Sequence, residues 1–406
     1  MSTFLLNKKY LPHRVGVCFI IGIIAGLFFH DFSIWVKPAG DLFMNMIKML
    51  IVPVIFFSVT SGIAAIVDNF SKYTAGNGII ELRRLISKKL HEDNNLEYTT
   101  DEICATVGAK QAIFNSIMAL VDPGDEVLLP VPCWVSYTEM IKFAGAKPVF
   151  VDVEAETFDL DIEALEKAVT TKTKAIVICT PNNPTGAVYS EGTLRKLADL
   201  ACKYDFYIIT DEIYEKLIYD DAKHFSIASI SKDVWNRTLT VNGFSKAYAM
   251  TGWRIGYVAA NKTIIDAIKK IQSQTTSATS AISQKAAVAA LSGPQHDLEV
   301  MVAEFDKRRI YLLQRLAEMP GVSCAKPRGA FYLLPDFSCY FGKKYRGREI
   351  KDAVDFANIL LEAVLVALVP GEAFNIKGKV RLSYSNSMEN LKEAMDRIQT
   401  FVRELE

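Results

Sequence analysis

One stretch of this sequence is more informative than any other, Asn242-Gly-Phe-Ser-Lys246-Ala-Tyr-Ala-Met-Thr-Gly-Trp-Arg254-Ile-Gly-Tyr257. Its lysine follows a short apolar run, Thr238–Val241, with a serine hydroxyl beside it and an arginine eight residues later. A lysine amine can form a Schiff base with a carbonyl compound, and an arginine can hold a phosphate. A single lysine is more often a solvated surface residue, so the interpretation depends on matching residues elsewhere.

From Tyr73 onward, short apolar runs alternate with amphipathic segments. The runs predict strands at Ile103–Val107, Glu126–Leu129, Pro148–Val153, Ala175–Cys179, Phe206–Thr210, Leu239–Val241 and Ile255–Ala259. Helices are expected between them, for example over 110–121 and over Gly192–Tyr204, whose leucines share one face. This alternation predicts an α/β domain with a mostly parallel sheet, and ligands bind at the carboxyl ends of such strands.

Candidate site residues follow two of these strands. The segment Thr106–Gln111 contains Gly108, Ala109 and Lys110, and small residues there let backbone N–H groups approach a phosphate at a helix N-terminus. An ordinary strand-to-helix turn would have the same composition. Trp134 follows another strand, where its indole would stack on a pyridine ring or fill the core.

Two further strands are followed by polar residues, and another candidate lies near the C-terminus. Asn183, in a turn-rich stretch, would donate its amide to a phenolic oxygen or simply shape the turn. Asp211 would keep a ring nitrogen protonated, so that the ring accepts electrons from a substrate carbanion, and Tyr214 would bond the phenolic oxygen. Arg381, in Val380–Tyr384, suits a bidentate substrate carboxylate or a surface salt bridge.

In this order and spacing, these residues make 73–406 resemble the fold-type I aminotransferases that depend on pyridoxal 5'-phosphate (PLP), close to the bacterial aspartate aminotransferases. The segments Tyr73–Ile79, Gly329–Tyr332 and Val369–Phe374 also match that family's pattern. The resemblance implies a PLP-binding large domain and a smaller α+β domain. It also implies transfer of an amino group between an L-amino acid and a 2-oxo acid.

The resemblance further implies roles for residues in catalysis. Lys246 would hold PLP as a Schiff base and move the proton at the substrate, with Asp211 on the ring nitrogen and Tyr214 on the phenolic oxygen. The other cofactor contacts would come from Gly108, Ala109, Lys110, Trp134, Asn183, Arg254 and Tyr73. The substrate contacts would come from Trp134, Asn183, Arg381 and Lys110.

Two of these implied roles bear on partners and substrate. Tyr73 resembles a tyrosine that reaches the partner subunit's phosphate, which implies a homodimer with shared sites. Lys110 resembles a lysine that binds a distal carboxylate, which favours aspartate or glutamate.

Composition narrows the alternatives. Lysine plus arginine and aspartate plus glutamate both number 46, and this zero net charge argues against nucleic acid as a partner. The seven cysteines are scattered without a CxxC pair, which favours a reduced cytosolic setting and no bound metal.

The first 72 residues read differently. Two uncharged runs, Val15–Phe29 and Met49–Val67, predict two transmembrane helices, and the basic residues before the first run place the N-terminus in the cytoplasm. A signal peptide is the alternative for the first run. The motifs Val36–Phe43, Met46–Pro53 and Phe56–Ile63 make residues 1–68 resemble the first helices of the dicarboxylate/amino acid:cation symporters. Two helices cannot enclose a transport site, so we expect at most a membrane tether for a cytoplasmic catalytic domain.

The expected organisation is therefore a membrane segment, 1–72, a large domain, 73–295, and a small domain, 296–406, whose N-terminal part is missing. The resemblance implies an N-terminal arm and a substrate lid where the membrane-like segment stands. We interpret the chain as a hybrid joined near Gly62–Lys72. PLP binding would survive, transamination would be impaired, and apolar surface on the small domain would be exposed.

Two other functions fit the same residues. A lyase or decarboxylase would use the same fold and cofactor, because fold alone does not fix the reaction. The chain would otherwise be a membrane-anchored symporter fragment fused to an inactive aminotransferase-like domain.

Overall fold

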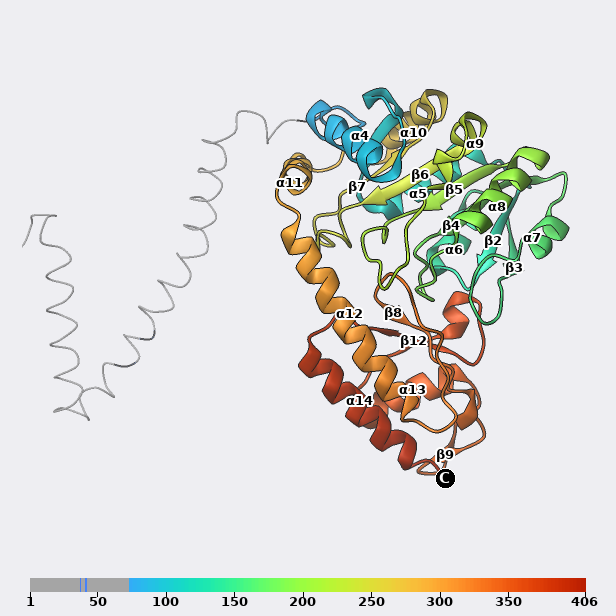
Figure 1. Ribbon diagram of the computed structural model, residues 1–406, viewed down its shortest axis with the longest axis vertical. Coiled ribbons are helices and arrows are strands. Elements are labelled where there is room, and N and C mark those ends of the chain that lie inside the picture. The colour runs from blue at the N-terminus through green and yellow to red at the C-terminus, as the bar shows by residue number, and fades with distance from the viewer. Residues whose placement is uncertain (1–36, 38–40, 42–72) are drawn as a thin grey trace, which may run out of the picture. The chain divides into compact units, whose positions relative to one another are not determined.

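The computed structural model describes residues 37, 41 and 73–406 of the chain, and residues 73–406 form one compact unit (Figure 1). Its centre is a seven-stranded sheet of order β1-β7-β6-β5-β4-β2-β3. The strands are β1 Ile103–Thr106, β2 Glu126–Val131, β3 Lys147–Asp152, β4 Thr173–Cys179, β5 Tyr207–Asp211, β6 Thr238–Gly243 and β7 Gly256–Ala259. All seven predicted strands are confirmed, with small shifts at their ends.

The sheet is mixed. The strands β3, β2, β4, β5 and β6 pair in parallel, while β7 is antiparallel to both β6 and β1. The expectation of a mostly parallel sheet is confirmed, and β7, next to the edge strand β1, is the one strand of this sheet that runs against its neighbours. The physical reason lies in the connection between β6 and β7, which contains no helix in the structure and returns the chain at the same end of the sheet, with Gly243 opposite Gly256.

Strand side chains alternate between two hydrophobic clusters, one on each face of the sheet. On β4 and β5, Ile176 and Ile208 join one cluster, while their neighbours Val177 and Ile209 join the other. Burial on both faces explains why these strands read as continuous apolar runs. The flanking helices are α4 Ile80–Asn94, α5 Gly108–Leu120, α6 Val135–Phe143, α7 Ile162–Ala168, α8 Glu191–Tyr204, α9 Lys232–Arg237, α10 Lys262–Thr275 and α11 Ala281–Ser292.

The helix predicted over Gly192–Tyr204 is confirmed as α8. Its start is fixed by Ser190, whose hydroxyl accepts a hydrogen bond from the Thr193 N–H at 3.0 Å. Its buried face, with Leu194 and Leu197, packs in the cluster that includes Ile176 and Ile208.

The C-terminal part of the unit lies below the main sheet in Figure 1 and begins with the long helix α12. Its elements are α12 His296–Ala317, β8 Tyr332–Leu333, β9 Lys344–Tyr345, β10 Arg348–Glu349, α13 Ala353–Val364, β11 Val369–Pro370, β12 Val380–Ser383 and α14 Met388–Arg403. The strands β11, β12 and β8 form a three-stranded antiparallel sheet. The proposed boundary at 295/296 falls where α12 begins and stays a prediction.

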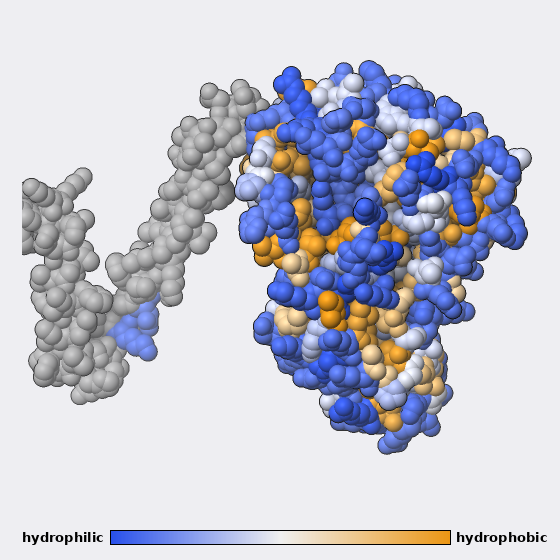
Figure 2. Space-filling model, viewed as in Figure 1, coloured by the Kyte–Doolittle hydropathy of each residue, from blue (hydrophilic) through white to orange (hydrophobic). Residues whose placement is uncertain are grey.

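Apolar side chains are exposed on this C-terminal part. Leu365 is 76 % exposed, and Val300 and Leu361 are about half exposed. Figure 2 shows hydrophobic residues on the viewed face over the region of α12 and α13. Exposed apolar side chains also occur on the main-sheet part, for example Phe143 at 73 %, so these residues do not test the expectation of exposed apolar surface on the small domain.

The two predicted transmembrane helices lie outside the described residues. Within the part of the chain that the structure describes, no helix is both long and apolar enough to cross a bilayer. Six of the seven cysteines lie in this part, and all six are free thiols.

Close backbone contact between β7 and α5 gives a testable constraint. A Cβ atom added at Gly256 would lie 2.5 Å from the backbone nitrogen of Ala109, a distance that forces the two elements apart. We expect Gly256→Ala to lower the free energy of unfolding by about 1–3 kcal/mol in urea denaturation. The matched control is Gly252→Ala, because nothing lies within 4 Å of that position. Equal stability of the two variants would contradict this packing.

Candidate active site

A cavity of about 320 Å³ opens where β4, β5 and β6 end and the three-stranded sheet approaches. Its lining brings together residues that are far apart in the sequence. Nine of the predicted site residues line it: Ala109, Lys110, Trp134, Asn183, Asp211, Tyr214, Lys246, Arg254 and Arg381. Gly108 lies against Arg254 at the same place. Tyr73 does not line the cavity and is 95 % exposed.

One end of the cavity is built to hold an anion. The helix α5 begins at Gly108 without a side-chain cap, so its first N–H groups are directed at this end. Gly108 has a φ of +76°, and a Cβ atom there would lie 2.5 Å from Nη2 of Arg254. The guanidinium of Arg254 therefore lies against the bare backbone of Gly108, where the positive φ favours glycine.

Arg254 itself adopts a left-handed conformation with a φ of +51°. Such a conformation costs about 1 kcal/mol or more for a residue with a side chain. Its Nη1 donates to the backbone oxygen of Thr251 at 2.8 Å, which fixes the guanidinium direction. The strained backbone thus places a cation beside the α5 N-terminus.

Asp211 is the last residue of β5, because the strand ends one residue later than predicted. Its carboxylate is buried. It accepts hydrogen bonds from the Tyr137 hydroxyl at 2.7 Å and from the Ile213 N–H at 3.2 Å. Burial raises the pKa of Asp211 to about 6, although the Tyr137 hydrogen bond opposes the shift. A buried carboxylate held only by neutral donors is suited to pair with a cationic nitrogen of a ligand.

Lys246 lies in the loop between β6 and β7, with its ammonium 5.0 Å from the ring of Phe331 and 5.6 Å from that of Tyr214. Burial, followed by the positive charge of Arg381, lowers the pKa of Lys246. A lowered pKa increases the fraction of neutral amine, which is the nucleophilic form. Lys246 and Asp211, which the sequence analysis proposed as partners in one site, therefore line the same cavity.

Arg381, on β12, enters the cavity from the opposite side. Its Nη1 donates to Oδ1 of Asn183 at 2.9 Å, and its guanidinium lies between the rings of Tyr332 and Phe374. Its Nε is buried and has no hydrogen-bond partner among the described residues. This arrangement leaves a rigid guanidinium with an unsatisfied donor, which suits a carboxylate ligand.

The two remaining predicted contacts lie side by side. The Lys110 ammonium is 4.9 Å from the Trp134 ring centroid, so the indole and the cation line the cavity together. The hydroxyl of Tyr214 lies 2.8 Å from that of Tyr332.

Several lining residues escaped the sequence analysis: Tyr137, Cys179, Ile213, Ser245, Thr251 and Tyr332. Tyr137 follows Trp134 by three residues, and helix α6 brings both toward the cavity, but nothing in the sequence connects Tyr137 to Asp211. Tyr332 belongs to Gly329–Tyr332, a segment already noted for its resemblance to the family, and that match was the available signal.

Comparison with known proteins supplies the family. The model of "Aminotransferase class I and II" matches residues 58–398. The chain belongs to the class I and II aminotransferases. It is 46 % identical over 346 residues to the bifunctional aspartate aminotransferase and glutamate/aspartate-prephenate aminotransferase of Petunia hybrida, covering 84 % of this chain and 72 % of the relative. It is 43 % identical to the aspartate aminotransferase of Bacillus subtilis, covering 82 % and 84 %.

Solved structures agree with this assignment. The aspartate aminotransferase of Rhizobium meliloti superimposes with a TM-score of 0.81 at 41 % identity, covering 84 % of this chain and 86 % of that one. The Thermus thermophilus enzyme with maleate gives a TM-score of 0.75 at 43 % identity, covering 81 % and 84 %. The aminotransferase therefore transfers an amino group between an amino acid and a 2-oxo acid, with PLP as its cofactor.

The cavity fits PLP. The α5 N-terminus with Arg254 offers an anion site for its phosphate, buried Asp211 offers a partner for its ring nitrogen, and Lys246 offers an amine for its aldehyde. All three features are formed by the protein's own residues.

A second family model, "Sodium:dicarboxylate symporter family", matches residues 11–80. This match overlaps the start of the aminotransferase match, and most of it lies outside the described residues.

The raised pKa of Asp211 predicts a pH dependence. PLP pairing needs the ionised carboxylate, so we expect the affinity of the cofactor-free aminotransferase for PLP to fall as the pH drops through about 6. Tyr137→Phe removes a hydrogen bond that lowers this pKa, and we expect the midpoint to move to higher pH. Tyr204→Phe is the control, because that hydroxyl donates to Glu166 at the surface. The measurement is a PLP titration by absorbance between pH 5 and 8, and identical midpoints in all three proteins would contradict the assignment.

Proposed function

We propose that this aminotransferase uses a dicarboxylic amino acid, aspartate or glutamate, as its amino donor. The single observation that carries the proposal is the charge of the cavity. Four cations line it, Lys110, Lys246, Arg254 and Arg381, while Asp211 is the one acidic residue in the lining among the described residues. Two further observations support the same substrate class. The relatives are named as aspartate or prephenate aminotransferases, and the Thermus thermophilus structure contains maleate, a dicarboxylate.

Three of the four cations divide between two ligands, and the fourth is Lys246. Arg254, with the backbone of Gly108, Ala109 and Lys110, would hold the PLP phosphate. Arg381 would bind the α-carboxylate of the amino acid through the guanidinium nitrogens that Asn183 does not occupy, including the unsatisfied Nε. The Lys110 side chain would then bind the distal carboxylate, beside Trp134.

Each remaining residue has a role that follows from its environment. When bound, PLP supplies an aldehyde that accepts the amino group and a ring that withdraws electrons from the substrate Cα. Lys246, with its lowered pKa, takes the proton from Cα and returns it. Asp211 would hold the ring nitrogen, Tyr214 and Asn183 would hold the phenolic oxygen, and Trp134 would stack against the ring. A lyase or decarboxylase would share these contacts, and the substrate panel below separates the reactions.

We further propose that the aminotransferase is a homodimer in which Tyr73 completes the phosphate site of the partner. Its 95 % exposure in the single chain supports this role, because an aromatic side chain rarely remains so open once its partner is present.

The N-terminal segment is assigned separately. We propose that residues 1–72 derive from a symporter, that they tether the catalytic part to a membrane, and that the two sequences were joined near Gly62–Lys72. The two overlapping family matches support the join. Alkaline extraction of membranes containing the full chain tests the tether: we expect the chain to stay in the pellet, and its release into the supernatant would contradict this part of the proposal.

Two variants test the proposed contacts with the two carboxylates of the substrate. We expect Arg381→Ala to lower kcat/KM for aspartate by about 100-fold or more, because the α-carboxylate loses a bidentate partner. Lys110→Ala should lower kcat/KM for aspartate and glutamate about tenfold and leave that for alanine nearly unchanged. Arg195→Ala is the control, since Arg195 forms an exposed ion pair with Glu191 on α8.

These variants are assayed with a panel of amino acids, together with the unsubstituted chain. Borohydride reduction and peptide mapping first establish that PLP is attached at Lys246 in each protein. Loss of substrate without formation of the matching 2-oxo acid would favour the lyase or decarboxylase. Absence of attachment in a folded, unsubstituted chain would favour the inactive, membrane-anchored alternative.

A further inference from the structure

The short turn after β5 has two functional faces. Asp211 and Tyr214 line the active-site cavity. Glu212 and Glu215 alternate with them and point away from it, with side chains that are only 0 % and 6 % exposed. Two carboxylates are thus buried directly behind the residues proposed to hold the cofactor.

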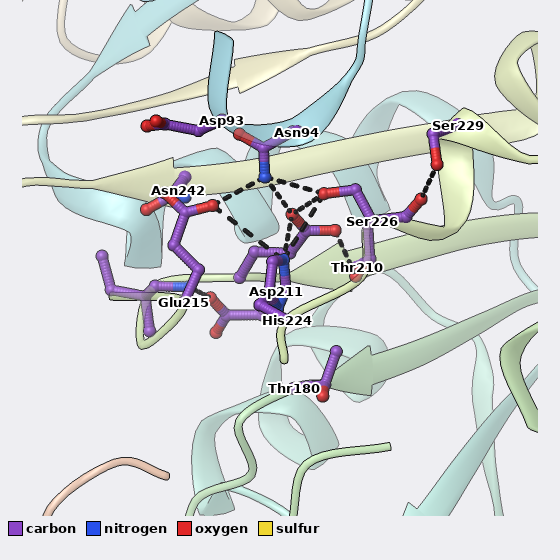
Figure 3. Close-up of polar contacts among 12 residues, drawn as sticks. Asp93, Asn94, Thr180, Thr210, Asp211, Glu215, His224, Ser226, Ser229 and Asn242 are labelled. Atoms are coloured by element: carbon purple, nitrogen blue, oxygen red, sulfur yellow. Dashed lines mark hydrogen bonds and ion pairs between the residues drawn. The ribbon is translucent and has the colours of Figure 1, made fainter. Parts of the chain in front are cut away.

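A polar network encloses these carboxylates, and Figure 3 shows the part of it around Glu215, His224, Ser226 and Asn94. Glu212 accepts hydrogen bonds from Ser226 Oγ at 2.6 Å and from Thr210 Oγ1 at 3.3 Å, and it lies 2.9 Å from Nε2 of His224. Asn94, at the end of α4, donates through Nδ2 to Glu215 at 2.7 Å and to Ser226 at 2.8 Å. The network therefore ties the turn to α4 and to the segment 224–226.

The charges of the network do not balance unless His224 is protonated. The Lys89 ammonium contacts Glu215 and neutralises one carboxylate, which leaves Glu212 to be neutralised. Glu212, Glu215 and His224 have the spacing of metal ligands, but Lys89 already supplies a cation to this cluster. The charged groups facing His224 are Glu212 and Glu215 from the turn and Lys89 from α4, with Asp93 and Lys216 paired beyond them.

The proton on His224 can leave without breaking its contact with Glu212. Nδ1 of His224 is buried and has no partner among the described residues, while Nε2 faces the carboxylate. Burial alone would lower the pKa of His224, but the carboxylates of Glu212 and Glu215 outweigh it, and the pKa lies above 6.5. The stabilisation from the charged form is complete below pH 6.5 and is lost as the pH rises through that raised pKa.

We propose that Glu212 and His224 form a positioning pair that sets both the placement and the electrostatics of Asp211 and Tyr214. This inference rests on the proposed roles of those two residues in holding PLP. Glu212 is adjacent to Asp211 in the chain, and its backbone N–H donates to Val241 of β6 at 2.8 Å, so a shift of its side chain moves the strand end that carries Asp211. Its negative charge also opposes ionisation of Asp211, and a protonated His224 beside Glu212 would offset that effect.

The test uses two variants whose electrostatic effects are opposite. Glu212→Gln removes a negative charge behind Asp211, so the midpoint of PLP binding near pH 6 should move to lower pH. His224→Gln removes a positive charge but keeps a donor for Glu212, so the midpoint should move to higher pH. We expect shifts of about 0.5 unit in each direction, with kcat for aspartate about tenfold lower and KM changed less than threefold.

His91→Gln is the matched control. His91 also lies 2.6 Å from a carboxylate, that of Glu97, but both side chains are exposed at the surface. We expect it to shift neither the midpoint nor kcat. Thermal unfolding of each variant, with and without PLP, separates loss of fold from a change in the site, and His224→Gln keeps the test available if Glu212→Gln does not fold.

The outcomes distinguish a failure of the positioning pair from a failure of the proposed function. Opposite shifts of the two midpoints support the positioning pair, because a purely structural role would move both in the same direction or not at all. Folded variants with unchanged midpoints and unchanged kcat overturn it. Failure of the unsubstituted chain to attach PLP at Lys246 overturns the proposed function instead, and the comparison of variants then loses its premise.

Discussion

The buried carboxylate of Asp211 is the constraint around which this active site is organised. Two neutral donors, the Tyr137 hydroxyl and the Ile213 N–H, stabilise it only in part, as its raised pKa indicates. An isolated buried charge is costly, so its surroundings must compensate. Lys246, Arg254 and Arg381 line the same cavity as Asp211. A cationic nitrogen of a ligand would pair directly with the Asp211 carboxylate and compensate its charge. Bound PLP with a protonated ring nitrogen would therefore stabilise the ionised form of Asp211.

Glycine determines the other end of the cavity. At Gly108 and Gly256, backbone from α5 and β7 and the guanidinium of Arg254 approach so closely that no Cβ atom fits. This packing brings a helix N-terminus and a cation together, which is the requirement for holding a phosphate. Arg254 accepts a left-handed backbone at the same place, and the surrounding contacts over-determine that conformation.

The two ends are joined by the loop between β6 and β7. Because β7 is antiparallel to β6, the loop stays at the carboxyl edge of the sheet and holds Lys246 there. A right-handed helical crossover would have carried the chain to the other end of the sheet before the next strand. The departure from a wholly parallel sheet is thus directly connected to the position of the reactive lysine.

The sequence by itself determined the strands, the helix α8 and nine of the residues that line the cavity. Local apolar periodicity and polar residues at strand ends are encoded within short segments. Together with the resemblance to a known family, they made Lys246, Asp211 and Arg381 identifiable before the fold was known. Only the tertiary structure decided the antiparallel place of β7, the hydrogen bond of Tyr137 to Asp211, and the network of Glu212 with His224. These depend on contacts between segments distant in the chain, whose geometry no local pattern encodes. The hydrogen bond between Arg381 and Asn183 spans 198 residues and is of the same kind.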